Sequence, residues 1–227
     1  MYNFKTIVIS HNQSKYIKYF EEKLNDIEHL YVIDRPTELY DKNINAIYNL
    51  NGSGFLAGYC RDLGASKYNY DGDLLFLDGD KYPVKGDLKE LENIPGDIVL
   101  LPVEKDPRKI FKELEPNTTR EYIIKDKINP YNNVFSCGIL LRKRFIDYVR
   151  KINNDGRIFK QIFDGNFGEE DTFLGDVVSY NYEKEKFSIY ITNKIILNGN
   201  LNGSKDRLDE LLVNFEKRNR LKFSGQL

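Results

Sequence analysis

The chain of 227 residues has no tryptophan, one methionine and only two cysteines, and neither sign of charge is in excess, with 34 lysines and arginines against 35 aspartates and glutamates. Because the charge is balanced, nothing in the composition requires a nucleic acid or an anionic membrane as partner. The cysteines, Cys60 and Cys137, lie far apart in apolar surroundings. We therefore expect two buried thiols rather than a disulfide.

Long apolar runs are also missing. No stretch of about 18 apolar residues is present to form a transmembrane helix. The first residues, MYNFKTIVISHN, lack the basic region and the long apolar stretch of a secretory signal. We therefore expect a cytoplasmic protein. Domains usually contain about 100–200 residues, so the length favours a single domain with one sizeable core.

The chain does contain a regular alternation of short apolar runs and amphipathic segments. In residues 11–27 the apolar residues Ile17, Phe20 and Leu24 recur at intervals of three to four, which predicts a helix. Residues 74–77, LLFL, are apolar on both faces, as in a parallel strand that helices cover. We expect strands at residues 6–10, 29–34 and 73–80, and helices between them at residues 11–27 and 54–66. This order predicts an α/β fold with a single, mostly parallel, Rossmann-like sheet flanked by helices.

The second half of the chain continues this alternation less regularly. We expect strands at residues 97–103, 121–125 and 135–142, and helices at residues 144–152, 169–180 and 205–220.

The acidic tripeptide Asp-Gly-Asp occurs on both sides of the apolar run 74–77. Asp71 and Asp73 precede the run, and Asp78 and Asp80 follow it. Two carboxylates at i and i+2 are a common way to hold a divalent metal that carries a phosphate. A four-residue strand separates the two pairs by about 13 Å, so both pairs cannot bind one ion. Since ligands of open parallel sheets gather outside the carboxyl ends of the strands, we predict that Asp78 and Asp80 are the functional pair.

Six segments occur in the order and register in which one protein family carries similar ones. They are VISHNQS at residues 8–14, YVIDRP at 31–36, YCRDLGAS at 59–66, LLFLDGD at 74–80, SCGILLRKRF at 136–145 and GNFGEEDTFLGD at 165–176. In these segments the chain resembles the GT-A fold glycosyltransferases, in particular family 2 and the galactosyltransferase type. The resemblance implies one glycosyltransferase domain with a nucleotide-binding half at residues 1–103, an acceptor and catalytic half at 104–200 and a C-terminal helix at 201–227.

The resemblance implies a site for a nucleotide-sugar donor, with a UDP-sugar as the expected one. Asp34 would accept the imide hydrogen of uracil, and Arg61 would pair with the diphosphate or the base, because its planar guanidinium suits phosphate oxygens. His11 and Asn12 would line the uracil or ribose pocket, and Gly138 would border the donor sugar. Three of these assignments have structural alternatives: Asp34 as a loop carboxylate or helix cap, Arg61 in a salt bridge with a neighbouring carboxylate, and His11 as an ordinary polar residue.

The second acidic pair fits the same interpretation. Asp80 would hold Mg²⁺ or Mn²⁺, directly or through water, and Asp78 would reach the ribose or the water shell of the metal. The cation would neutralise the charge that develops on the diphosphate leaving group. Many metal-dependent members of the family use a later histidine as a further ligand, but both histidines of this chain lie within the first thirty residues. The sequence therefore leaves the metal shell incomplete.

Three acidic residues, Glu169, Glu170 and Asp171, follow Gly168 at an expected helix start. Acidic residues favour the first turn of a helix because of the helix dipole, and this alone would account for one of them. Three in a row exceed what capping requires, and neighbouring negative charges raise the pKa of a carboxyl group toward a value that suits a general base. The galactosyltransferase pattern assigns the base to Glu170 and the family 2 pattern assigns it to Asp171.

The expected activity is metal-dependent, inverting transfer of a sugar, most simply a hexose, from a UDP-sugar to an acceptor hydroxyl. One alternative is a sugar nucleotidyltransferase, although that class places a glycine-rich basic loop after the first strand, which residues 10–20 lack. Another is a nucleotide-sugar-binding protein without activity. The acceptor stays open between a glycan, a protein, a lipid-linked sugar and a hydroxymethylated base in DNA, whose phosphates the basic stretches 142–151 and 216–223 could contact.

Overall fold

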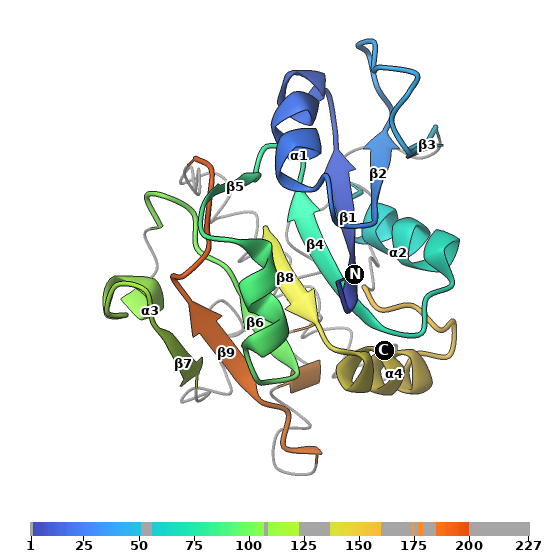
Figure 1. Cartoon of the computed structure of the whole chain (residues 1–227). Coiled ribbons are helices and arrows are strands. Elements are labelled where there is room, and N and C mark those ends of the chain that lie inside the picture. Colours follow the sequence, from blue (N-terminus) through green and yellow to red (C-terminus); the bar gives the residue numbers. More distant parts are fainter. Residues whose placement is uncertain are drawn as a thin grey trace.

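An eight-stranded sheet in the order β3-β2-β1-β4-β8-β6-β9-β7 forms the centre of the molecule (Figure 1). The structure is a computed structural model that describes residues 2–50, 56–106, 109–122, 137–159, 174, 177–178 and 185–199. The strands of this sheet are β1 (Phe4–Ser10), β2 (His29–Asp34), β3 (Ala46–Asn49), β4 (Asp73–Asp78), β6 (Ile98–Leu100), β7 (Thr119–Tyr122), β8 (Gly138–Leu141) and β9 (Ile189–Thr192). Neighbouring strands are parallel except at the pairs β4–β8, β6–β8 and β7–β9. Six of the eight strands therefore run in one direction, which confirms the predicted α/β class and its mostly parallel sheet.

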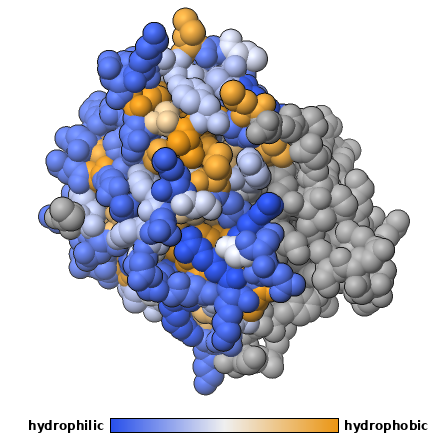
Figure 2. All heavy atoms as spheres, turned by 90° about the vertical axis from the view of Figure 1, so that its right-hand side faces the viewer, coloured by the Kyte–Doolittle hydropathy of each residue, from blue (hydrophilic) through white to orange (hydrophobic). Residues whose placement is uncertain are grey.

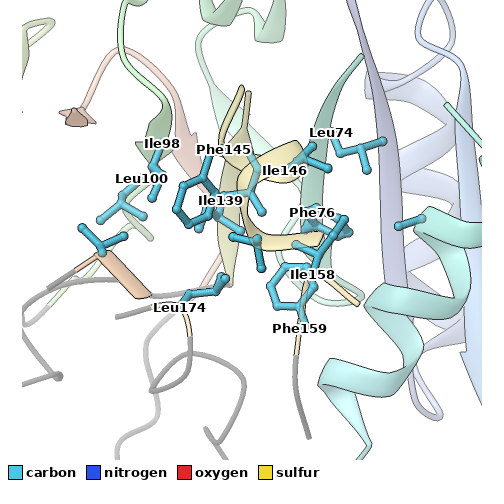
Figure 3. Close-up of a cluster of buried hydrophobic side chains, with 14 of the residues drawn as sticks. Leu74, Phe76, Ile98, Leu100, Ile139, Phe145, Ile146, Ile158, Phe159 and Leu174 are labelled. Carbon is cyan, nitrogen blue, oxygen red and sulfur yellow. The ribbon is translucent and has the colours of Figure 1, made fainter. Parts of the chain in front are cut away.

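The side chains of each strand alternate between two apolar clusters, one on each face of the sheet. From β4, Leu74 and Phe76 belong to one cluster, and Leu75 and Leu77 belong to the other. The first cluster, part of which Figure 3 shows, is covered by α2 (Ala57–Tyr68) and α4 (Lys143–Ile152). The second is covered by α1 (Ile17–Lys23) and the 3₁₀ helix η2 (Leu88–Asn93). Helices on both faces explain why the run 74–77 is apolar throughout.

A second, two-stranded sheet lies beyond the carboxyl end of β4. It pairs β5 (Pro83–Lys85) with β10 (Ile196–Leu197) in antiparallel orientation. Directly after β10, the backbone N–H of Asn198 donates to the carbonyl of Tyr82 at 2.8 Å. This small sheet therefore holds residues 198 and 199 beside the turn that follows β4. The remaining short helices are η1 (Ser14–Tyr16) and α3 (Lys109–Lys112).

Most of the expected elements of the second half are present. The strands expected at 97–103 and 135–142 are β6 and β8, the helix at 144–152 is α4, and the strand at 121–125 begins two residues earlier as β7. The strands β3, β5, β9 and β10 were not predicted from the sequence. Of the expected helix 169–180, the described residues 174, 177 and 178 are helical and buried, and the helix at 205–220 lies outside the described residues. Both cysteines are buried free thiols, as expected. Among the helices of the described part, none has the length and apolar character to span a membrane.

Helix α2 approaches the sheet most closely at Gly64. A Cβ atom added there would lie 2.7 Å from Ile7 Cγ2 and 2.9 Å from Val32 Cγ2, which is closer than real Cβ atoms come. We expect Gly64→Ala to lower the free energy of unfolding by about 1–3 kcal/mol through overpacking. The loss should appear although alanine is the better helix former by about 1 kcal/mol. Urea unfolding measures it.

Ser66→Ala is the control, because Ser66 is exposed on the same helix. It should leave the stability unchanged or raise it slightly. Equal stability of the two variants would contradict the close packing of α2 on the sheet.

Candidate functional site

The carboxyl ends of β1 and β4 lie where the winding of the sheet changes direction. From β1 the chain passes through α1 to β2 on one side, and from β3 it returns through α2 to β4 on the other side of β1. The two helices cover opposite faces. Open α/β sheets bind their ligands at such a point. A Cβ on Gly79, after β4, would lie 2.5 Å from Gln13 Oε1 and 2.8 Å from the carbonyl oxygen of Ile9, so the loops after the two strands are in contact and only glycine fits.

Arg61 of α2 and Asp78, the last residue of β4, form an ion pair at this point. Arg61 Nη2 donates to Asp78 Oδ1 at 2.7 Å, and the side chains are 1% and 31% exposed. The guanidinium carbon also lies 5.5 Å from the centre of the Phe159 ring. A guanidinium this deeply buried requires a paired carboxylate. The structure therefore confirms the salt bridge that the sequence left open for Arg61, and it places the pair where a ligand would bind.

Asp80 and Lys81 form a second ion pair two residues further on. Lys81 Nζ donates to Asp80 Oδ2 at 2.6 Å, and the carbonyl of Asp80 accepts from Asn198 Nδ2 at 3.1 Å. The Lys81 side chain is 10% exposed and that of Asp80 is 32% exposed. Lys81 is not among the predicted site residues, because a lysine after an acidic turn usually projects into solvent.

Asp34, at the end of β2, is buried in a third arrangement of this kind. Its Oδ1 accepts from Arg35 Nε at 3.0 Å and from Asn49 Nδ2 at 2.7 Å, and its Oδ2 accepts from Arg35 Nη2 at 2.7 Å. Arg35 has a φ of 40°, in the left-handed region. Both oxygens of the carboxylate thus already accept hydrogen bonds within the chain, so a uracil imide would have to share or displace a donor.

His11 and Cys60 lie beside Asp34. His11 Nδ1 is 2.8 Å from the carbonyl oxygen of Asp34, and the imidazole is about half exposed. Burial raises the pKa of Cys60 to about 12, and the negative charge of Asp34 adds to the effect. Cys60 is therefore a neutral thiol and not a nucleophile.

Two further predicted site residues have clear roles in the fold. Asn12 has a φ of 53°, and its Oδ1 accepts from the backbone N–H of Thr37 at 2.7 Å. Gly138 is the first residue of β8 and lies opposite Leu77, and a Cβ on it would lie 2.2 Å from Leu197 Cδ1. A larger residue at position 138 would therefore have to displace the Leu197 side chain. The predicted bases Glu170 and Asp171 lie outside the described residues.

The first acidic pair has a structural role at the opposite end of β4. Asp73 accepts from Arg142 Nη1 at 2.7 Å and from the backbone N–H of Lys143 at 2.8 Å, at the start of α4. Asp71 pairs with Lys143 Nζ at 2.7 Å. These contacts attach α4 to the sheet. The two copies of the tripeptide thus lie at opposite ends of one strand, as the sequence analysis expected.

The basic stretch 142–151 contributes to the same attachment. Arg144, for example, donates to the buried carboxylate of Asp97 at 2.7 Å. At the start of α4, the basic residues are therefore engaged by carboxylates of the chain itself.

Figure 2 shows the side of the molecule where α2 and β3 lie, whose described surface is largely hydrophilic with smaller apolar areas.

The described residues at this edge do not by themselves fit a divalent cation. Within the described ranges, no three His, Cys, Asp or Glu side chains come together in a way that could hold a metal ion. Asp78 and Asp80 each give an oxygen to a cation of the chain, Arg61 and Lys81. The two carboxylates are thus already neutralised where the sequence analysis placed Mg²⁺ or Mn²⁺.

Asp62, next to Arg61 on α2, connects that helix to the chain beyond α4. Its Oδ1 accepts from the backbone N–H groups of Ile158 at 2.9 Å and Phe159 at 3.1 Å, whereas its Oδ2 has no hydrogen-bond partner among the described residues. Burial raises the pKa of Asp62 to about 7, against the opposing effect of the two N–H donors and Arg157. The carboxyl group therefore changes its charge near neutral pH.

Comparison with known proteins leaves the family open. No family model and no curated protein matches the chain. A solved structure assigned as a glucose-1-phosphate thymidylyltransferase from Bacillus anthracis, in complex with sucrose, is similar at 8% identity and a TM-score of 0.44 over 88% of each chain. The inositol-1-phosphate CTP transferase from T. maritima is similar at 12% identity and a TM-score of 0.45, over 95% of this chain and 96% of the other. Likenesses this weak carry no argument about function.

The raised pKa of Asp62 predicts a pH-dependent stability. The native state holds the proton more tightly than the unfolded chain, in which an aspartate titrates near pH 4. The contribution of Asp62 to stability is therefore fully present below about pH 4 and is lost as the pH rises toward 7. Asp62→Asn keeps an acceptor for the two N–H groups and cannot ionise, so the stability of this variant relative to the wild type should increase between about pH 4 and pH 7.

Urea unfolding at several pH values measures this difference. Asp26→Asn, on the exposed turn after α1, is the control for removing a carboxylate elsewhere. The same slope with pH for wild type and Asp62→Asn would show that Asp62 does not titrate in this range.

Proposed function

We propose that the chain is a transferase that binds a nucleotide sugar at the carboxyl ends of β1, β2 and β4. The main support is that three aspartates there, Asp34, Asp78 and Asp80, are each paired with a basic residue of the chain, Arg35, Arg61 and Lys81. Cations of this kind suit a diphosphate, and carboxylates suit the hydroxyls of a ribose or sugar.

The position of these pairs at the change of winding supports the same proposal. The tight contact at Gly79 joins the loops after β1 and β4 and leaves no room for a side chain between them. A ligand bound there meets backbone and charged groups from both strands. A UDP-sugar is the donor that the sequence resemblance implies. The Mg²⁺ or Mn²⁺ that it also implies is not part of the proposal, because the described residues at this edge offer no ligand set for a divalent cation.

Two reactions use such a site. In glycosyl transfer, which the sequence pattern favours, an acceptor oxygen attacks the anomeric carbon and the bond from that carbon to the diphosphate breaks, which releases a nucleoside diphosphate. In nucleotidyl transfer, the reaction that the names of both solved structures imply for those proteins, a sugar phosphate attacks the α-phosphorus of a nucleoside triphosphate and pyrophosphate leaves. For glycosyl transfer, Glu170 and Asp171 stay the predicted bases.

The products decide between the two reactions. We expect the protein, incubated with a panel of UDP-, CDP- and TDP-sugars, to consume one of them. Nucleotidyl transfer, run in reverse, needs added pyrophosphate and yields a nucleoside triphosphate and a sugar phosphate, whereas glycosyl transfer or donor hydrolysis yields a nucleoside diphosphate without pyrophosphate. Chromatography of the nucleotides separates these outcomes. No binding and no turnover of any nucleotide sugar would refute the proposed class.

Arg61 tests the location of the site. Loss of one charge-assisted hydrogen bond costs about 1.5–3 kcal/mol, so Arg61→Gln should weaken binding of the preferred nucleotide sugar by about 10–100-fold. Gly64→Ala is the matched control, because it destabilises the same helix away from the ion pair and should keep the wild-type affinity. Calorimetric titration gives both values. An unchanged affinity in Arg61→Gln would assign Arg61 to the fold alone.

A further inference from the structure

Lys81 differs from an ordinary surface lysine in how it is held. Its backbone N–H donates to the carbonyl of Asp78 at 2.8 Å, which closes the turn after β4, and its ammonium returns to Asp80 Oδ2 at 2.6 Å. On the other side, a Cβ on Gly199 would lie 3.6 Å from Lys81 Nζ. Lys81 is thus enclosed between the turn and the chain that follows β10.

The two partners differ in exposure. The Lys81 side chain is 10% exposed, and that of Asp80 is 32% exposed. In the described part of the chain, Asp80 is the one hydrogen-bond acceptor of the ammonium. A buried ammonium without a counter-charge is strongly unfavourable, so Lys81 depends on Asp80. The carboxylate itself can still be reached from solvent.

A divalent cation that binds at Asp80 would compete with Lys81 for the carboxylate. It would have to displace Lys81 from the carboxylate or bind beside its positive charge, and both cost free energy. Asp78 does not compensate for this, because it is already paired with the buried Arg61. The acidic pair is therefore poorly suited to a free metal ion as long as Lys81 is present.

We propose that Lys81 is the resident cation of this site: it occupies Asp80, keeps divalent metals from the acidic pair and supplies positive charge beside the phosphates of the substrate. The last part rests on the proposed function, whereas the competition with metal does not. Lys81 is therefore a positioning residue, because it acts through its ion pair with Asp80.

Titration with Mn²⁺ alone, without nucleotide, tests the competition by calorimetry and by electron paramagnetic resonance of the free ion. We expect the wild type to bind Mn²⁺ weakly and Lys81→Gln to bind one Mn²⁺ at least about 10-fold more tightly. The gain should disappear in the double variant Lys81→Gln/Asp80→Asn. Lys143→Gln is the matched control, because it frees Asp71 in the other Asp-Gly-Asp copy and should create no tighter site. Equal Mn²⁺ affinity of wild type and Lys81→Gln, or no Mn²⁺ binding by either, would overturn the proposal.

Lys81→Met serves as a second variant, and melting curves establish that each variant is folded. The wild type offers a test that needs no substitution, because acetic anhydride should modify Lys81 far more slowly than the exposed Lys89, and Mn²⁺ should not change this ratio. A rise in Lys81 labelling at micromolar Mn²⁺ would overturn the proposal. A tighter Mn²⁺ site in Lys81→Gln without nucleotide-sugar binding by the wild type would instead refute the proposed function and leave the competition intact.

Discussion

The ion pair between Arg61 and Asp78 is the constraint on which the proposed ligand-binding edge depends. The guanidinium lies with 1% of its side chain exposed, and the carboxylate of Asp78 at the end of β4 pairs with it. Breaking a fully buried pair costs about 3–5 kcal/mol, and the cost here is smaller because Asp78 is 31% exposed. The pair fixes the end of β4 relative to α2, and the turn at Gly79 follows from that position.

Around this pair, the chain balances its own charges. Asp34 with Arg35 and Asp80 with Lys81 repeat the arrangement on either side, so the edge carries many charges and little net charge. Such a site can bind a diphosphate when the arginine and lysine side chains exchange their internal carboxylate partners for phosphate oxygens. Breaking each internal pair costs free energy, so only a ligand that replaces these interactions well would bind tightly. The proposed roles of Arg61 and Lys81 are two aspects of this exchange.

The fold could be predicted from the sequence because each of its signals is local. The alternation of apolar runs with helical periodicity identified β1, α1, β2, α2 and β4, and the position of each Asp-Gly-Asp copy relative to LLFL correctly gave the polarity of the strand. The strands β3, β5, β9 and β10 were missed, because strands of only two to four residues carry little periodicity. The hydrogen-bond partners of the site residues also could not be predicted from the sequence. Asn49 donates to Asp34, and Asn198 donates to the carbonyl of Asp80, which lies 118 positions away in the chain. No spacing rule connects residues so far apart.

That separation has a consequence for the order in which the protein forms. The turn at Asp80 receives its hydrogen bond from Asn198, and β5 receives its partner strand from β10, near the end of the described chain. During synthesis, a nascent chain that has reached only β8 can already pair β1, β2, β3 and β4, but it lacks the segment that encloses Lys81. Contacts of such long range form late, because closing a long loop must precede any gain from it. The proposed nucleotide-binding edge is therefore encoded early in the chain and completed last, so an incompletely synthesised protein would contain the residues of the proposed site without its charge balance.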